Sequence, residues 1–423
     1  MTGMRYFLCF AALAVALLIA PVVFPSSVAI TTMSLMGVMI IFALSYNMLL
    51  GQTGLLSFGH AVYYGLAGFC AAHAMNIIAA GKLPVPLPVI PLVGAAAGLF
   101  FGVIFGAVST RRAGTVFAMI SLGLGELVAA FALVLHTFFG GEDGISTNRT
   151  KLLAFFGYKF GPQIQVYYLI AFWCFVCIVL MYALTRTPFG RMCNAVRDNP
   201  ERVEFIGYST QRVRFQAFVL SAMFAGVAGA LAAINFELMN LQSIGAAASG
   251  QVLLMSFVGG AGHFAGPVIG AIFVTFLQVS LSDVTKAWML YFGLMFIFIV
   301  MYAPGGMAGW LAMHWPLLRN GRIVRLLPAY ALAAAPMLGL ALGGVMLIEL
   351  AHHMLVQAAS DGPQLSIFGI RMNGASPWPW LAALVLFAGG AFGVRAAWPR
   401  VVDAWGRALA APGTTPGTTK VNS

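Results

Sequence analysis

The stretch "VAITTMSLMGVMIIFALSYNMLL", residues 28–50, decides the class of fold. It lies within residues 6–81, which contain no Asp, Glu, Lys or Arg, and it exceeds the roughly 20 apolar residues that cross a bilayer. Charged residues make up 8% of the whole chain, against about 25% in a soluble domain. Backbone groups inside a bilayer must be paired without water, and continuous apolar runs favour helices over barrel strands. The sequence therefore predicts an all-α, polytopic membrane bundle.

The apolar runs predict about 10–11 spans. The first run follows Arg5 and is longer than a signal-peptide core, so we expect it to be a retained helix. Lys and Arg gather in a few connections, most densely in 185–214, which holds six Arg. Such loops stay in the cytoplasm, so the net charge of +11 predicts bilayer topology rather than nucleic-acid binding. We expect cytoplasmic N- and C-termini. The expected helices are 6–24, 28–50, 55–79, 87–109, 114–136, 166–184, 215–234, 251–281, 287–310, 328–350 and 379–397.

Two Gly-rich segments interrupt the apolar pattern, "NMLLGQTGLLSFGHAVYYGLAG" (Asn47–Gly68) and "SFVGGAGHFAGPVIGAIF" (Ser256–Phe273). Because Gly and Pro break helices, we expect 251–281 to form two half-helices that enter and leave the same membrane face. Broken helices in matching halves of a transporter point to the substrate path, although small residues also serve close helix packing. The residues expected along this path, called the path set, are Asn47, Gly51, Gly54, Ser57, His60, Glu126, Gly259, Gly260, Gly262 and His263.

Three members of the path set can ionise. Glu126 lies near the middle of the expected helix 114–136, where a carboxyl group is costly and indicates a role in gating or in joining two helices. His60 and His263 each follow a turn glycine and are either polar groups in the path or structural donors. No catalytic dyad or metal-ligand cluster accompanies them. The Gly81-Lys82 pair lacks the other residues of a phosphate-binding loop, so any ATP hydrolysis is expected on another chain.

A charged island, "GRMCNAVRDNPERVEFIGYSTQRVR" (Gly190–Arg214), separates two apolar segments without charge. Eight of its 25 residues are charged. An ordinary solvated basic loop is one interpretation, but the island also contains acidic residues and the apolar pair Phe205 and Ile206. This mixture is typical of an amphipathic helix that docks in a groove on a soluble partner.

In these features the chain resembles the LivM-type permeases of branched-chain amino acid ABC importers. The resemblance rests on four segments in order: "ALSYNMLLGQTGLLSFGHAVYYGLAGFCAA", "RRAGTVFAMISLGLGEL", "TPFGRMCNAVRDNPERVEFIGYSTQRVRFQAFVLSAMFAGVAGAL" and "LLMSFVGGAGHFAGPVIGAIF". It covers roughly residues 5–312. The stretch "NFELMNLQSIGAAASGQ" is only loosely similar, and 313–423 lies outside the pattern.

The resemblance implies a membrane subunit without cofactors. Its partners would be a LivH-like permease, two ABC ATPase subunits and a periplasmic substrate-binding protein. The island would be the coupling helix for the ATPase, ended by Gly207. Its expected contact residues, called the coupling set, are Arg197, Asp198, Glu201, Arg202, Glu204, Phe205, Ile206 and Gly207.

The expected organisation is a permease core at 1–312 with the coupling loop at 186–214. An extension at 313–410 with two further spans and a disordered tail at 411–423 would follow. The expected function is ATP-driven import of branched-chain or other hydrophobic amino acids. A urea or amide permease of the same family is an alternative. So is a self-sufficient secondary transporter or channel, which would need several intramembrane acids where this chain has Glu126 almost alone.

Overall fold

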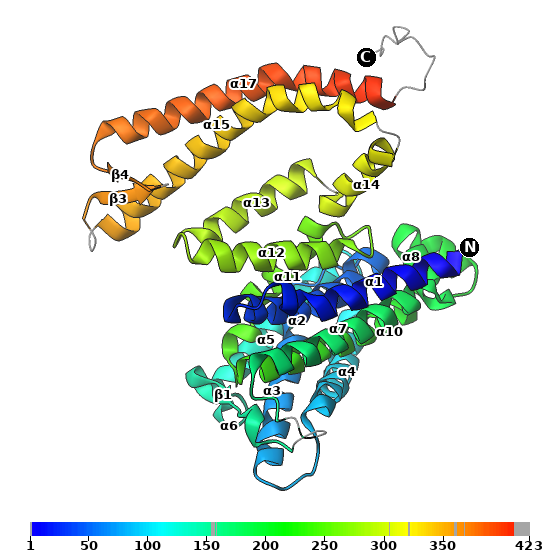
Figure 1. Cartoon of the computed structure of the whole chain (residues 1–423). Helices are drawn as coiled ribbons and strands as arrows, with labels where there is room; N and C mark the ends of the chain where they lie inside the picture. Colours follow the sequence, from blue (N-terminus) through cyan, green and yellow to red (C-terminus); the bar gives the residue numbers. More distant parts are fainter. Residues whose placement is uncertain are drawn as a thin grey trace. The chain divides into compact units, whose positions relative to one another are not determined.

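A computed structural model of the chain describes residues 2–409, except 154–156, 158, 304, 320–321, 359–361 and 368. The chain is mostly helical (Figure 1) and forms two compact units. The first unit comprises Met1–Val284 with Leu294–Gly309, and the second comprises Thr285–Gly293 with Trp310–Ser423. The tail expected at 411–423 lies outside the described residues.

The first unit is built around α10 (Thr210–Phe236), which packs against α2, α3 and α4. Small residues allow the closest of these contacts: a Cβ on Gly94 of α4 would lie 2.3 Å from the Gly226 carbonyl oxygen of α10. The other helices of this unit are α1 (Thr2–Val23), α2 (Ser27–Thr53), α3 (Ala61–Ala79), α4 (Ile90–Ser109), α5 (Thr115–Val134), α6 (His136–Phe139), α7 (Gln163–Arg186), α8 (Pro188–Asp198), α9 (Pro200–Phe205), α11 (Ala246–Gly259) and α12 (Gly266–Ser282).

Contacts between helices show at which end of the first unit each connecting loop lies. At one end, Gly106 near the end of α4 packs on Phe218 near the start of α10. The basic connections at 110–114 and 187–209 therefore lie at the same end, as the expected alternation of spans requires. We call this the basic end.

The long connection between α6 and α7 lies at the opposite end. The amide of Asn76, in the last turn of α3, donates a hydrogen bond to the Ser146 carbonyl oxygen at 3.0 Å. The two-residue strands β1 (Ile145–Ser146) and β2 (Leu238–Met239) pair antiparallel and join this connection to the end of α10.

The helices α11 and α12 fold back on each other as a hairpin, with a turn at 260–265. A Cβ on Gly270 would lie 1.9 Å from the Met255 carbonyl oxygen, so only glycine allows this approach. Further from the turn, the side-chain amides of Gln251 and Gln278 are hydrogen-bonded to each other. The expected pair of half-helices at 251–281 is therefore present.

Among the described residues, eight helices are long and apolar enough to cross a membrane. A ninth candidate is the pair α13 (Trp288–Tyr302) and α14 (Gly306–Arg319), whose axes differ by 50°. The expected continuous helix 287–310 is therefore wrong, since the chain bends after Tyr302. The count is eight or nine rather than 10–11, because the apolar part of α1 and both hairpin helices fall below spanning length. The fold class, a multi-pass helical membrane protein, is confirmed.

The second unit contains α15 (Leu327–His352) and α17 (Pro377–Leu409), which pack along their length as an antiparallel pair. Gly343 of α15 lies against the backbone of Phe387, where a Cβ would approach its nitrogen to 2.4 Å. The strands β3 (Gln364–Ile367) and β4 (Ile370–Asn373) form a hairpin between the two helices along the chain. The two helices expected in the extension are thus present, and the domain boundary expected at 312 stays a prediction.

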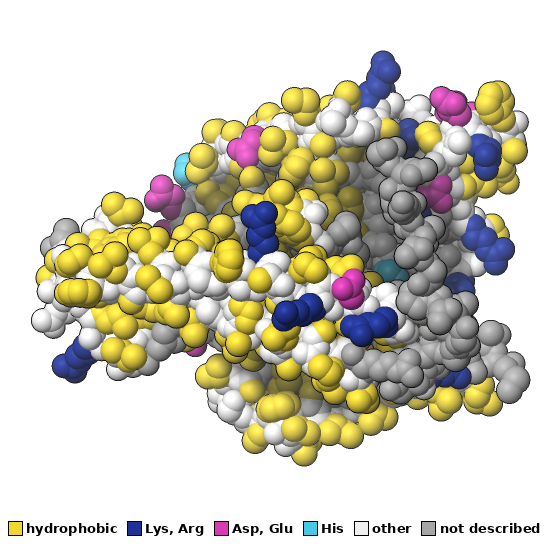
Figure 2. Space-filling model, turned by 90° about the horizontal axis from the view of Figure 1, so that it is seen from above, with side chains coloured by type: hydrophobic (Ala, Val, Ile, Leu, Met, Phe, Trp, Pro, Cys, Tyr) yellow, Lys and Arg dark blue, Asp and Glu magenta, His cyan; other side chains and the backbone are white. Residues whose placement is uncertain are grey.

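Large hydrophobic side chains cover much of the surface (Figure 2). Examples at high exposure are Met119 and Val134 on α5, at 75% and 73%. A soluble protein rarely exposes large continuous apolar areas, whereas a bilayer is the natural solvent for such a surface. Lipid contact, the expected setting of this chain, accounts for the pattern.

Candidate functional site

The charged island folds as two short helices, where the sequence predicted one. The helix α8 begins at Pro188 and is capped by the Thr187 hydroxyl, which accepts a hydrogen bond from the Gly190 N–H at 3.3 Å. It ends at Asp198 because Pro200 disfavours helical geometry at the residue before it, and Asn199 is extended. The Asn199 side chain then caps α9.

The island is anchored on the first unit by a small apolar core. Cys193 and Val196 of α8 and Val203 of α9 are buried against Val213 and Ala217 of α10. Burial raises the pKa of the Cys193 thiol to about 12, because the thiolate would lose its hydration. The thiol is therefore a packing group, and the island is a firm element of the basic end.

The tip of the island presents apolar side chains to the exterior. Phe205 is 90% exposed and Ile206 is 63% exposed. Gly207 has φ +88° and ends α9. Its N–H donates to the Glu204 carbonyl oxygen, while the Tyr208 N–H donates to the Val203 carbonyl oxygen, which is the Schellman arrangement of a glycine cap. The predicted helix end at Gly207 is confirmed.

Arg197 points inward from the island. Its Nη1 donates a hydrogen bond to the Gly51 carbonyl oxygen in the last turn of α2, and its Nε donates to Asp198 at 2.9 Å. Its aliphatic stem lies over Gly54, whose left-handed backbone caps α2. The sequence placed Arg197 in the coupling set, on the surface that meets the ATPase. The guanidinium contacts Gly51 of the path set, while the Arg197 side chain stays 37% exposed, so its contact with an ATPase remains a prediction.

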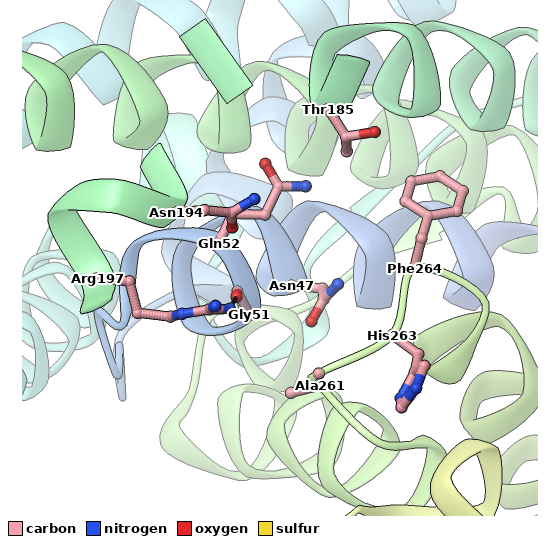
Figure 3. Close-up of a pocket in the computed structure, with 10 residues that line it drawn as sticks. Asn47, Gly51, Gln52, Thr185, Asn194, Arg197, Ala261, His263 and Phe264 are labelled. Atoms are coloured by element: carbon pink, nitrogen blue, oxygen red, sulfur yellow. Dashed lines mark hydrogen bonds between the residues drawn. The ribbon is translucent and has the colours of Figure 1, made fainter. Parts of the chain in front are cut away.

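A pocket of about 190 Å³ lies beside this contact (Figure 3). It is lined from four segments: α2, the end of α7, α8 and the turn 260–265. Members of the path set and one member of the coupling set therefore share a single site. The lining residues are Asn47, Gly51, Gln52, Thr185, Asn194, Arg197, Ala261, Gly262, His263 and Phe264.

Gly51 lies where α2, the turn 260–265 and Arg197 of α8 meet, which we call the junction. A Cβ there would lie 2.2 Å from the Asn47 Oδ1 and 2.3 Å from the Ala261 carbonyl oxygen. The helix α2 and the turn 260–265 thus touch through backbone at this point. Asn47 is 3% exposed, and its Oδ1 has no hydrogen-bond partner among the described residues. A buried amide oxygen without a partner is costly, and Asn47 also lines the pocket, where a bound water or ligand could supply one.

The break between α2 and α3 is held by two serines that the sequence did not single out. The Phe58 N–H donates to the Ser121 hydroxyl of α5 and the Ala61 N–H donates to the Ser249 hydroxyl of α11, both at 3.0 Å. These bonds satisfy N–H groups that have no partner within a helix. A lone serine in an apolar helix carries no sequence signal of its distant partner, so pattern reasoning had no means to find either residue.

His60 and Ser57 are fully buried beside this break. The Ser45 hydroxyl donates to the Phe42 carbonyl oxygen at 2.7 Å and lies 3.0 Å from the His60 Nε2. The His60 Nδ1 has no hydrogen-bond partner among the described residues. The ring stacks on Phe42, with centroids 5.6 Å apart. His60 is thus packed in the interior, at 0% exposure.

Glu126 lies on the opposite side of α5 from the residues that pack on the first unit. The buried stripe of α5 includes Phe117, Ser121 and Val128, whereas Glu126 is exposed. It makes no hydrogen bond or ion pair with the described part of the chain. One of the two expected roles of Glu126 is to join two helices. The described part of the chain shows no such bond between Glu126 and another helix.

The remaining expected residues fall into two groups. Gly259 packs on Gly266 within the hairpin, and Gly260, at φ +102°, packs on Gly305. In the island, Glu204 accepts a hydrogen bond from the Thr210 hydroxyl at 2.7 Å. All eight members of the coupling set are exposed: Arg197, Asp198, Glu201, Arg202, Glu204, Phe205, Ile206 and Gly207.

Residues 28–303 match the family of branched-chain amino acid transport system permease components. The chain belongs to this family. The matched range contains α2 to α13 with both Gly-rich breaks and the island, and it leaves out α14, α15 and α17. Membership makes the chain a non-catalytic transmembrane subunit of an ABC transporter without a cofactor of its own, which confirms the predicted class.

The relatives differ in what their names say they carry. The chain is 28% identical over 317 residues to the high-affinity branched-chain amino acid transport system permease protein LivM of Escherichia coli (strain K12), covering 69% of this chain and 73% of that protein. It is 24% identical over 320 residues to the probable branched-chain amino acid transport permease protein LivM of Methanocaldococcus jannaschii, with coverage of 64% and 90%. The fructose import permease protein FrcC of Rhizobium meliloti is 28% identical over 200 residues, with coverage of 44% and 54%. No solved structure matches the chain significantly.

Proposed function

We propose that this chain is a membrane subunit of an ATP-driven importer of branched-chain or other hydrophobic amino acids in the bacterial inner membrane. Its partners would be a second permease related to LivH, two ABC ATPase subunits and a periplasmic substrate-binding protein. One observation carries the proposal within the family: an apolar tip, Phe205 at 90% exposure, stands on a firmly packed charged island. An exposed aromatic residue on a rigid support is typical of a protein contact.

The position of Glu126 supports the second permease. A carboxyl group in the middle of a spanning helix is costly against lipid and lines a protein interior or a water-filled path. Because Glu126 is exposed on this chain and unpaired within its described part, another subunit or the substrate path must face it. Under this proposal α5 lies at the path between the two permeases, and the basic end is cytoplasmic.

The class of substrate follows from the relatives and is open to a direct test. Branched-chain amino acids are named for the relatives with the widest coverage, and fructose for a shorter match. We expect labelled leucine, isoleucine or valine to be taken up by cells that carry the chain with its partner genes. Uptake should fall when the chain is deleted. Competition by urea or fructose, with none by the three amino acids, would replace this substrate class by another in the same family.

The test of docking is Phe205→Asp. An anion at the apolar tip would be buried unpaired in the ATPase groove, which is strongly unfavourable. We expect ATPase subunits to be lost when the tagged variant is purified from membranes of its native host, and uptake to be lost with them. Gly207→Val should act similarly, because a β-branched residue does not accept the left-handed backbone at φ +88°.

The matched control is Gln211→Asp, which adds the same charge six residues away in the first turn of α10. An acidic residue is tolerated there by the helix dipole. Protease accessibility of the island checks that every variant is inserted. Normal recovery of ATPase subunits with both Phe205→Asp and Gly207→Val would show that the island is only a solvated loop.

A further inference from the structure

The coupling set and the path set meet at one hydrogen bond. We propose that Arg197 is a positioning residue that transmits movement of the island to α2 and to the turn 260–265, and so joins ATPase docking to the substrate path. The inference rests on the proposed function. It assigns to Arg197 a role different from the ATPase contact that the sequence predicted.

The first link joins the island to α2. The Gly51 carbonyl belongs to the last four residues of α2, whose carbonyl groups have no partner within the helix. A guanidinium is a favourable partner at this negative end of the helix dipole. Gly54 has no side chain, and a Cβ there would already lie 3.1 Å from the Arg197 Cγ. Arg197 thus contacts the end of α2 twice: its guanidinium binds the Gly51 carbonyl oxygen, and its aliphatic stem packs on Gly54.

The second link joins α2 to the hairpin turn. Gly51 lies directly against the Ala261 carbonyl oxygen, and no side chain stands between them. A shift of the α2 terminus therefore displaces the turn or opens this contact. Gly260 of this turn also packs directly on the backbone of Gly305. Backbone contacts of this kind do not absorb movement as long side chains do, because close-packed interiors transmit displacement.

The pocket gives this junction room to move. It has a volume of about 190 Å³ and is lined by α8, α2, the end of α7 and the turn. Three polar side chains in its wall, Gln52, Asn194 and His263, make no side-chain hydrogen bond to the described residues. In Figure 3 the Arg197 side chain extends from α8 to Gly51 along one side of this space. Arg197 is therefore a polar link between α8 and the end of α2 at the edge of this space.

The test compares Arg197→Ala with Arg191→Ala, which removes an exposed arginine from the same helix. Each tagged variant is purified with its partners from the native host. Arg197→Ala should retain its ATPase subunits, because the apolar tip is untouched, but import fewer amino acids per ATP hydrolysed. The expected loss is roughly tenfold or more, as for a hydrogen bond to a charged group. Arg197→Lys should restore part of it, and Arg191→Ala should match the wild type.

A distance measurement separates transmission from simple stability. Spin labels are placed at Gln52→Cys and Asn194→Cys after Cys9 and Cys70 are replaced by Ser, since the other three cysteines are buried. With Arg197 present, α8 and α2 should keep one distance in the ATP-free and vanadate-trapped states. With Arg197→Ala, the distance should differ between these states.

Two results would overturn the inference. If Arg197→Ala and Arg191→Ala import the same amount of amino acid per ATP hydrolysed, the Arg197 hydrogen bond does not transmit movement from the island to α2. Loss of the ATPase subunits from Arg197→Ala would make the residue a docking contact instead. A wild-type chain that purifies without any ATPase would be a different failure, since it would remove the proposed function itself.

Discussion

Arg197 and Phe205 lie eight positions apart in one charged island and differ in their contacts. Phe205 is 90% exposed, whereas the Arg197 side chain is 37% exposed and its guanidinium reaches the Gly51 carbonyl oxygen. Ordinary composition rules predict a buried aromatic residue and an arginine that makes no contact with the helix interior. The exposed Phe205 indicates a contact with a partner protein. The Arg197 guanidinium binds a free carbonyl group at the C-terminal end of α2. At the scale of single residues, these two exceptions carry most of the functional argument.

Glu126 gives the clearest prediction at this scale. Since it has no partner in the described chain, Glu126→Leu should leave the thermal unfolding of the purified chain unchanged. Uptake of labelled leucine in the assembled transporter should fall, because the variant removes the ionisable group from the path. Glu126→Gln keeps hydrogen bonding and should reduce uptake less. Lower thermal stability of the isolated Glu126→Leu chain would point to a helix-joining role, and unchanged uptake in both variants would make the residue a bystander.

The sequence was informative at this scale where backbone geometry limits the residue type. It placed the helix end at Gly207 correctly, because a left-handed cap favours glycine. It could not show that Ser121 and Ser249 hold the break between α2 and α3, because their partners are 63 and 188 residues away. It likewise could not show where the Arg197 side chain points, since neighbours in the sequence do not determine that.

Among the elements, the hairpin of α11 and α12 shows how glycine and proline residues determine where a helix breaks and how closely two helices pack. Its turn was predicted from glycine and proline, and both helices are present on either side of it. The closeness of the two helices depends on glycines whose hydrogen faces a partner backbone, as at Gly270. The charged island was predicted as one helix and forms two, because Pro200 divides it. The bend after Tyr302 was missed although Pro304, Gly305 and Gly306, residue types that break helices, follow it in the sequence.

A test of the hairpin uses two glycines on its two helices. Gly270→Ala places a Cβ 1.9 Å from the Met255 carbonyl oxygen and should lower the free energy of unfolding by about 1–3 kcal/mol. Gly250 has no atom within 4 Å of its Cβ position, so Gly250→Ala should be neutral or slightly stabilising. Thermal unfolding of the purified chains, followed with a thiol-reactive dye, compares the two. Equal stability of both variants would contradict the observed packing.

At the scale of the whole molecule, the family match and the compact units divide the chain in different ways. The match covers 28–303, whereas residues 285–293 pack with the second unit. In that unit the Tyr291 hydroxyl donates to Glu349 of α15 at 2.9 Å. The extension therefore shares a segment with the matched region, and a cut at the expected boundary of 312 would remove its packing partners. The sequence could predict two more helices there, but not this exchange.

ATP dependence of transport tests the central claim most directly. The tagged chain is purified with its associated subunits, reconstituted into liposomes with the substrate-binding protein outside and ATP inside, and uptake of labelled leucine is followed. The account predicts accumulation with ATP and none with a non-hydrolysable analogue, because the chain belongs to a family of non-catalytic permease components and energy must come from partner ATPases. It also predicts no accumulation by the chain alone under a proton or sodium gradient. Accumulation by the purified chain alone, driven only by such a gradient, would contradict it.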